Sequence, residues 1–136
     1  MNESELFIVE PATEDDLNFI RASWLRSFCD SQFARAAAPS YWVEHLKVRD
    51  KLLTRCGAVV ARVEEVPTSV CGWACFEANA IHYVFVKPRW RRKGIAKKLL
   101  EPFDLAPSVV YTHRTKDSER INIPETWVHN PYEAIR

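Results

Sequence analysis

The sequence of 136 residues lacks the features of membrane and secreted proteins. No apolar run approaches the ~20 residues that a membrane-spanning helix needs, so we expect no transmembrane segment and no membrane partner. The N-terminal MNESELF has no basic stretch followed by a long apolar one, which argues against a secretory signal. Because a secretory signal is not expected, we expect a cytoplasmic protein whose four cysteines are reduced thiols. The length predicts a single domain over residues 1–136.

Metal-ligand spacing is missing as well. None of the four histidines stands at such a spacing. Cys71 and Cys75 lie four residues apart on one predicted strand, which puts them on the same face about 13 Å apart. That separation suits neither a disulfide nor a zinc knuckle. We therefore expect no metal.

Acidic residues are absent from one segment of the chain. Residues 87–98, KPRWRRKGIAKK, carry seven basic side chains, whereas the rest of the chain carries 12 basic and 18 acidic ones. The net charge of +1 thus hides an acidic body with one cationic segment. Such segregation indicates an anionic partner that meets one site. Nucleic acid is the less favoured partner, because Trp90 is the only aromatic residue among these basic ones.

The apolar patterns predict an α/β fold of the α+β type. Strands are expected at residues 6–10, 58–63, 69–77, 81–86 and 108–112, and helices at 13–29, 40–57 and from Gly94 onward. The order β-α-α-β-β-β-α-β gives a mixed, mostly antiparallel sheet flanked by helices, with its last two strands parallel. A turn around Pro67 is expected to join the second and third strands. Residues 113–136 are expected to form an irregular tail.

The strand at 81–86, the cationic turn and the helix after Gly94 together predict an anion site. A helix begins with backbone N–H groups that have no partner inside the helix, and its dipole favours negative charge there. Gly94 allows the backbone to approach a ligand closely. The segment has neither the spacing of a Walker motif nor the three glycines of a dinucleotide fingerprint, so it predicts a different pyrophosphate cradle.

The turn resembles the signature of the GNAT superfamily of acyl-CoA-dependent N-acyltransferases. That signature is Gln or Arg, two residues, Gly, one residue, then Gly or Ala, and it reads here as Arg91-Arg92-Lys93-Gly94-Ile95-Ala96. The preceding valine-rich strand and the order of elements also match, over about residues 6–112. The resemblance implies acetyl-CoA as cosubstrate and a fourth strand that bulges and splays from the fifth. The residues that it implies for binding acetyl-CoA are Val84, Phe85, Val86, Arg91, Arg92, Lys93, Gly94, Ile95, Ala96 and Lys97.

The same resemblance places a general base on or near the fourth strand. Alternation puts His82 on the face of Ala80 and Val84, and histidine is the side chain most easily poised near neutral pH. Glu77 is a second candidate base, while Tyr111 and His113 are candidate acids. For each of these residues, a purely structural role is the alternative.

The resemblance therefore predicts an N-acetyltransferase that moves an acetyl group from acetyl-CoA to a primary amine by direct attack in a ternary complex. The alternative is a GNAT-like module without turnover that binds CoA, a protein or nucleic acid. Only 24 residues follow Thr112, which is short for the helix and hairpin that usually end this fold. Either a second copy in a homodimer completes the fold, or the tail covers the substrate side. The segment TWVHNPYEA is then an aromatic lid or an anchor to the core.

Overall fold

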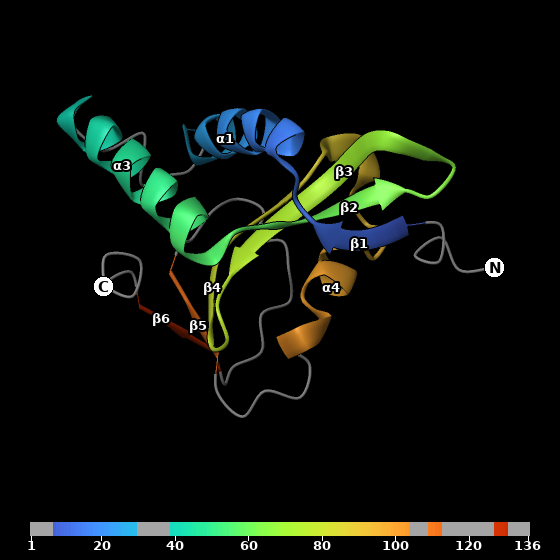
Figure 1. Cartoon of the computed structure of the whole chain (residues 1–136). Coiled ribbons are helices and arrows are strands. Elements are labelled where there is room, and N and C mark those ends of the chain that lie inside the picture. Colours follow the sequence, from blue (N-terminus) through green and yellow to red (C-terminus); the bar gives the residue numbers. More distant parts are fainter. Residues whose placement is uncertain (1–6, 30–38, 104–108, 113–126, 131–136) are drawn as a thin grey trace.

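The computed structural model describes residues 7–29, 39–103, 109–112 and 127–130 (Figure 1). The strands are β1 (Phe7–Pro11), β2 (Val59–Val63), β3 (Val66–Phe76), β4 (Ala80–Val86), β5 (Val109–Tyr111) and β6 (Trp127–His129). The helices are α1 (Glu14–Cys29), α3 (Pro39–Cys56) and α4 (Ile95–Leu99), with short 3-10 turns at Pro88–Trp90 and Glu101–Phe103. None of the described helices is long and apolar enough to cross a membrane.

The six strands form one sheet whose order follows the chain. β1 to β4 pair antiparallel, whereas β5 is parallel to β4 and β6 is parallel to β5. This arrangement confirms the predicted α/β class and the predicted order as far as β5. The prediction of an irregular tail is wrong for residues 127–129, which form β6. The hairpin turn lies at residues 64–65, and Pro67 belongs to β3.

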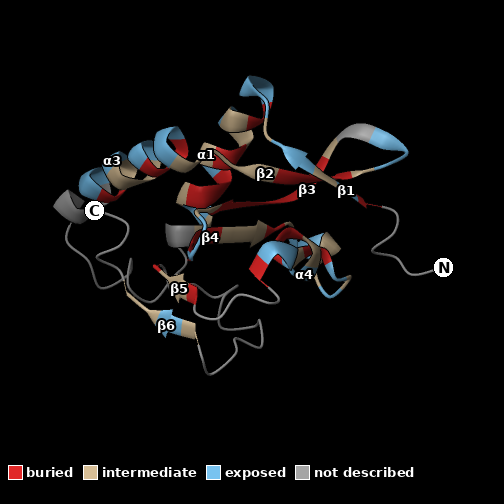
Figure 2. Ribbon diagram, turned by 60° about the horizontal axis from the view of Figure 1, so that its bottom comes forward, coloured by how far each residue is buried: buried red, intermediate tan, exposed pale blue. Residues whose placement is uncertain are grey.

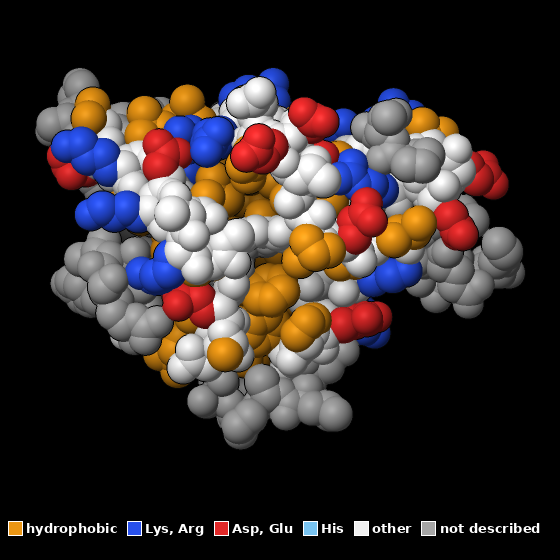
Figure 3. Space-filling model, viewed as in Figure 1, with side chains coloured by type: hydrophobic (Ala, Val, Ile, Leu, Met, Phe, Trp, Pro, Cys, Tyr) orange, Lys and Arg blue, Asp and Glu red, His pale blue; other side chains and the backbone are white. Residues whose placement is uncertain are grey.

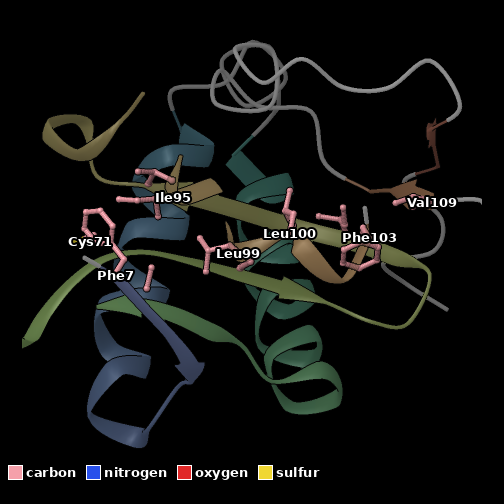
Figure 4. Packing of buried hydrophobic residues seen from close by; sticks show 11 residues of the cluster. Phe7, Cys71, Ile95, Leu99, Leu100, Phe103 and Val109 are labelled. Atoms are coloured by element: carbon pink, nitrogen blue, oxygen red, sulfur yellow. The ribbon is translucent and has the colours of Figure 1, made fainter. Parts of the chain in front are cut away.

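Helices cover both faces of the sheet (Figures 1 and 2). α1 and α3 lie on one face, which we call the helix side. The core beneath them, the helix-side core, includes Trp24, Leu52 and Trp73. α4 lies on the other face, where Ile95 and Leu99 pack into a second cluster, the α4-side core (Figure 4). Burial on both faces explains why the central strands are rich in valine and aromatic residues.

A polar cluster fixes the start of α1 against β2. The backbone N–H of Thr13, the residue before α1, donates to Asp16 Oδ2 at 2.8 Å. The Arg62 guanidinium donates to Asp16 and also to Glu10. The buried charge on Arg62 is thereby paired on both sides, and α1 is held at a fixed angle to the sheet.

An irregularity in β3 changes the face of one cysteine. The β2–β3 register passes from Ala61↔Gly72 to Arg62↔Val70, so Cys71 is an extra residue in β3. As a result Cys71 belongs to the α4-side core and Cys75 to the helix-side core. The prediction that both cysteines share a face is wrong, because a bulge breaks the alternation of side chains along a strand.

Replacing Gly72 by alanine should destabilise the sheet. A Cβ on Gly72 would lie 2.7 Å from the backbone oxygen of Phe85, so β3 and β4 would have to move apart. We expect Gly72→Ala to lower the free energy of unfolding by about 2 kcal/mol in urea denaturation. Gly57→Ala is the matched control, because it meets no atom within 4 Å. Its left-handed backbone should cost only ~1 kcal/mol, and equal losses in both variants would contradict the clash.

Candidate functional site

The sheet opens between β4 and β5. These strands pair only at Ala80↔Val110 and Ile81↔Tyr111. Next to these pairs, Thr112 N donates to Ile81 O at 3.0 Å. Beyond this fork, no described strand pairs with that edge of β4. This is the edge at which the GNAT resemblance implies a splay between the fourth and fifth strands.

The open edge offers backbone groups at alternate residues. In an antiparallel pair only alternate residues bond to the neighbouring strand. The bond from Lys87 N to Cys71 O, at 2.8 Å, shows which residues of β4 bond to β3 and so sets the phase of this alternation. In this phase Val84 and Val86 direct their N–H and C=O groups away from β3, toward the open edge. Phe85 instead pairs with Trp73 and uses its backbone within the sheet. Val84 and Val86 are thus the two residues of the predicted trio with backbone groups on the open edge.

The cationic turn follows directly after this edge. Arg92 (φ 64°) and Gly94 (φ 81°) both have left-handed backbone conformations, and α4 begins at Ile95. The first intrahelical bond of α4 runs from Lys98 N to Gly94 O, at 3.0 Å. The backbone N–H groups of residues 95–97 therefore have no acceptor within the helix. Together with the exposed Arg92 and Lys97 side chains, they form a concentrated set of donors for an anion.

Other basic side chains of the segment hold the turn in place. Arg91 Nε donates to Val86 O at 3.0 Å, and Lys98 Nζ donates to Phe7 O. These bonds tie the turn to β4 and to β1. On the face shown in Figure 3, Lys and Arg side chains are interspersed with Asp and Glu around a central apolar area. That mixed surface contrasts with the segment 87–98, where every charged side chain is basic.

His82 lies at a bulge in β4. The β3–β4 register passes from Cys75↔Tyr83 to Phe76↔Ile81, which leaves His82 as an extra residue. Its ring lies on the helix side, near Arg55 of α3, whereas Val84 packs against the α4-side core. The prediction that His82 shares a face with Val84 is wrong, because the bulge shifts the alternation by one residue.

A hydrogen-bonded network surrounds the His82 ring, which is fully buried. His82 Nε2 lies 2.6 Å from Glu77 Oε2, and His82 Nδ1 lies 3.0 Å from Thr112 Oγ1. Arg55 Nη2 donates to the same Glu77 oxygen at 2.8 Å. The structure thus brings together the two predicted base candidates, and it adds Arg55 and Thr112, for which the sequence gives no spacing signal.

Glu77 remains ionised in this network. Burial opposes its ionisation, but hydrogen bonds from His82 and Arg55 outweigh burial and lower the pKa of Glu77 to about 2. A carboxylate with so low a pKa is a weak proton acceptor near neutral pH. Its chemical role in the network is to accept hydrogen bonds and to stabilise positive charge on its neighbours.

Cys56 borders the same network at the end of α3. Its Sγ, a Glu77 oxygen and a His82 nitrogen all lie within 4.8 Å of one another, which is close enough to consider a metal site. The Arg55 guanidinium lies 2.8 Å from Glu77 Oε2 and 3.5 Å from His82 Nε2. A metal cation would meet this resident positive charge, so the donor set suits a hydrogen-bonded network better.

Cys56 should be the most reactive of the three described thiols. A hydrogen bond from Cys75 lowers the pKa of Cys56, and burial raises it. A further hydrogen bond from Arg55 tips the balance, so the pKa of Cys56 falls to about 7. Burial raises the pKa of the Cys71 thiol, and the Cys75 pKa is also raised. We expect iodoacetamide at pH 7.5 to alkylate Cys56 at least ten times faster than Cys71 or Cys75.

Peptide mapping measures this difference, since trypsin cuts after Arg55 and Arg62 and thus separates Cys56 from the other two. Arg55→Gln is the companion variant, because it removes the cation beside the thiol and should slow alkylation at Cys56. Equal rates at all three cysteines would contradict the assignment.

Tyr111 lies away from the network. Its half-buried ring packs against the α4-side core and lies 5.1 Å from the His129 ring of β6. His82 lies on the opposite face of the sheet. The structure therefore does not bring Tyr111 to the two base candidates, and His113 is outside the described residues. Trp127 also packs against the α4-side core, so this part of the tail is an anchor.

The fold and the site define a class of protein. A mixed sheet that opens between parallel strands, next to a cationic turn that starts a helix, is the arrangement of acyl-CoA-dependent acyltransferases. The sequence model of the acetyltransferase (GNAT) family matches residues 11–103. The chain therefore belongs to the acetyltransferase (GNAT) family.

Several solved structures share the fold of this chain. Apo-form YjaB from Escherichia coli is 20% identical, with a TM-score of 0.56 over 76% of this chain and 68% of that one. A histone acetyltransferase HPA2-related protein from Corynebacterium glutamicum is 19% identical (TM-score 0.52; 70% and 68% covered). PaiA N-acetyltransferase from Thermoplasma acidophilum, in complex with coenzyme A, is 15% identical (TM-score 0.50; 70% and 67% covered). No protein of curated function matches the sequence.

Proposed function

We propose that this protein transfers an acetyl group from acetyl-CoA to a primary amine by direct attack in a ternary complex. The observation that carries the proposal is the open edge of β4, which runs from the fork at Ile81 directly into the cationic turn. Acetyl-CoA supplies the acetyl group as a thioester. The structural neighbour PaiA is in complex with coenzyme A, which supports this choice of cosubstrate.

The donor set of the turn fits the anionic part of this cosubstrate. Backbone N–H groups from Arg92 to Lys97 would bind the pyrophosphate, and the Arg92 and Lys97 side chains add positive charge. The N–H and C=O groups of Val84 and the N–H group of Val86 match the amides of a pantetheine arm, whereas the Val86 C=O accepts from Arg91. In this proposal the turn fixes the anionic end of the ligand, and the edge of β4 directs the other end toward the fork.

The polar network at the fork supplies the acid–base chemistry of the proposal. A primary amine is protonated near neutral pH, so it must lose a proton before or while it attacks the thioester. His82 is the proposed base. Glu77 stabilises the positive charge that His82 gains, and Arg55 keeps Glu77 ionised.

An acceptor panel tests the proposal. Acetyl-CoA at 100 times its dissociation constant should stabilise the fold by ~2.7 kcal/mol, and CoA should be released in the presence of at least one amine. Arylalkylamines, polyamines, aminoglycosides and lysine peptides cover the main classes of primary amine. Binding of acetyl-CoA without release of CoA on any of them would favour the alternative of a binding module. Loss of both would overturn the cosubstrate as well.

A further inference from the structure

We propose that Thr112 relays the proton between the amine and His82, so that Thr112, His82 and Glu77 act as one hydrogen-bonded chain at the fork. The proposal rests on the acetyl transfer proposed above. It assigns a role to a residue that lies beyond the part of the chain matched by the family model, which ends at residue 103.

His82 Nε2 donates a proton in its bond to Glu77. Glu77 Oε2 lies 2.6 Å away, which is hydrogen-bond distance. An ionised carboxylate has lone pairs and no proton, so it can only accept. Arg55 also donates to this carboxylate, which reinforces its ionised form. Nε2 must therefore carry the proton in this bond.

The other ring nitrogen of His82, Nδ1, accepts a hydrogen bond from Thr112. In a neutral imidazole with a proton on Nε2, Nδ1 is an acceptor. Thr112 Oγ1 lies 3.0 Å from Nδ1, so the hydroxyl donates to this nitrogen. A second acceptor near the hydroxyl, the backbone oxygen of His82, is 3.4 Å away and offers a weaker bond. The basic nitrogen of His82 thus faces Thr112.

Burial limits access to His82. Its side chain has no exposed surface, so an amine cannot meet Nδ1 directly in this arrangement. Thr112 is the last described residue of this stretch that bonds to β4, through its N–H to Ile81 O. It is itself buried, with 3% of its surface exposed, so the amine must enter at this end of the pairing before its proton can reach the hydroxyl. A proton that reaches Nδ1 from that end passes through the hydroxyl.

The transfer balances in atoms and charge. An N–H bond of the amine breaks as its proton joins Thr112 Oγ1, while the original hydroxyl proton moves to His82 Nδ1. Thr112 remains a neutral hydroxyl, and His82 becomes an imidazolium whose Nε2–H faces the Glu77 carboxylate. This order of groups, in which a hydroxyl, an imidazole and a carboxylate bond in series, is the arrangement that moves protons in hydrolytic triads.

The decisive variants are Thr112→Val and Thr112→Ser, compared with His82→Ala and the double variant. Valine keeps the size of threonine but removes the hydroxyl, so we expect kcat to fall about 100-fold with an unchanged KM for acetyl-CoA. Serine restores the hydroxyl and should keep kcat within about fivefold of the parent. The double variant His82→Ala/Thr112→Val should be no slower than His82→Ala, because both changes break one relay.

A second measurement needs no activity. Long-range ¹H–¹⁵N NMR on the histidine-labelled protein should show His82 with its proton on Nε2 and with Nδ1 unprotonated. A proton on Nδ1 in the neutral ring would overturn the relay, and so would a Thr112→Val enzyme with at least a third of the parental kcat. A parent protein that transfers no acetyl group to any amine would instead overturn the proposed function, whatever the tautomer.

Discussion

Gly94→Glu should abolish measurable binding of acetyl-CoA while the protein stays folded. Gly94 stands immediately before the first residue of α4, in the segment that we propose binds the pyrophosphate. A carboxylate there would bring negative charge against a negatively charged ligand, which costs several kcal/mol. We expect the dissociation constant, measured by isothermal titration calorimetry, to rise by about 100-fold or more.

Gly94→Asn is the matched control for this variant. Gly94 has a φ of 81°, a conformation that costs most side chains about 1 kcal/mol but that asparagine tolerates better. Asparagine adds a side chain of similar reach without charge, so it should weaken binding by less than about tenfold. Equal affinities of the parent and Gly94→Glu would show that the pyrophosphate binds elsewhere.

His82→Ala should lower kcat by 10²–10⁴-fold, the usual contribution of general acid–base catalysis. The KM for acetyl-CoA should change little, because the ring of His82 lies on the helix side and the turn lies at the far end of β4. The loss corresponds to about 3–5 kcal/mol of activation free energy. Steady-state kinetics with a saturating amine measure both constants.

A second buried histidine provides the control for His82→Ala. His45 on α3 is buried beside Trp24, with ring centroids 6.4 Å apart, and it lies outside the network at the fork. His45→Gln should keep kcat within about twofold of the parent, even if the variant is less stable. If His82→Ala keeps most of its kcat, His82 is not the base.

The order of elements and the cationic turn were accessible from the sequence because both depend on local signals. Thr13 precedes α1, Gly57 follows the end of α3, and Gly94 precedes α4, as the pattern of residues indicates. The apolar strands between these points have enough length and alternation to be found one by one. The expectation that β4 splays from β5 came from the family resemblance.

The face of individual side chains was not accessible in the same way. Cys71 and His82 each stand at a bulge, and a bulge depends on how two strands pair rather than on the residues of one strand. Arg55 and Thr112 were missed for a related reason. They join the site through contacts to residues 22 and 30 positions away, and no local spacing encodes such contacts.

The network at the fork is assembled from four different elements. Arg55 comes from α3, Glu77 follows β3, His82 lies on β4 and Thr112 follows β5. Any contiguous piece of the chain that contains all four must span residues 55–112, with the β2–β3–β4 meander and the crossover through α4. The turn at residues 91–96 is a short module by comparison. A protein that shares only this turn can share the proposed cosubstrate site without sharing the proposed proton chemistry, so the two properties are free to diverge independently among related sequences.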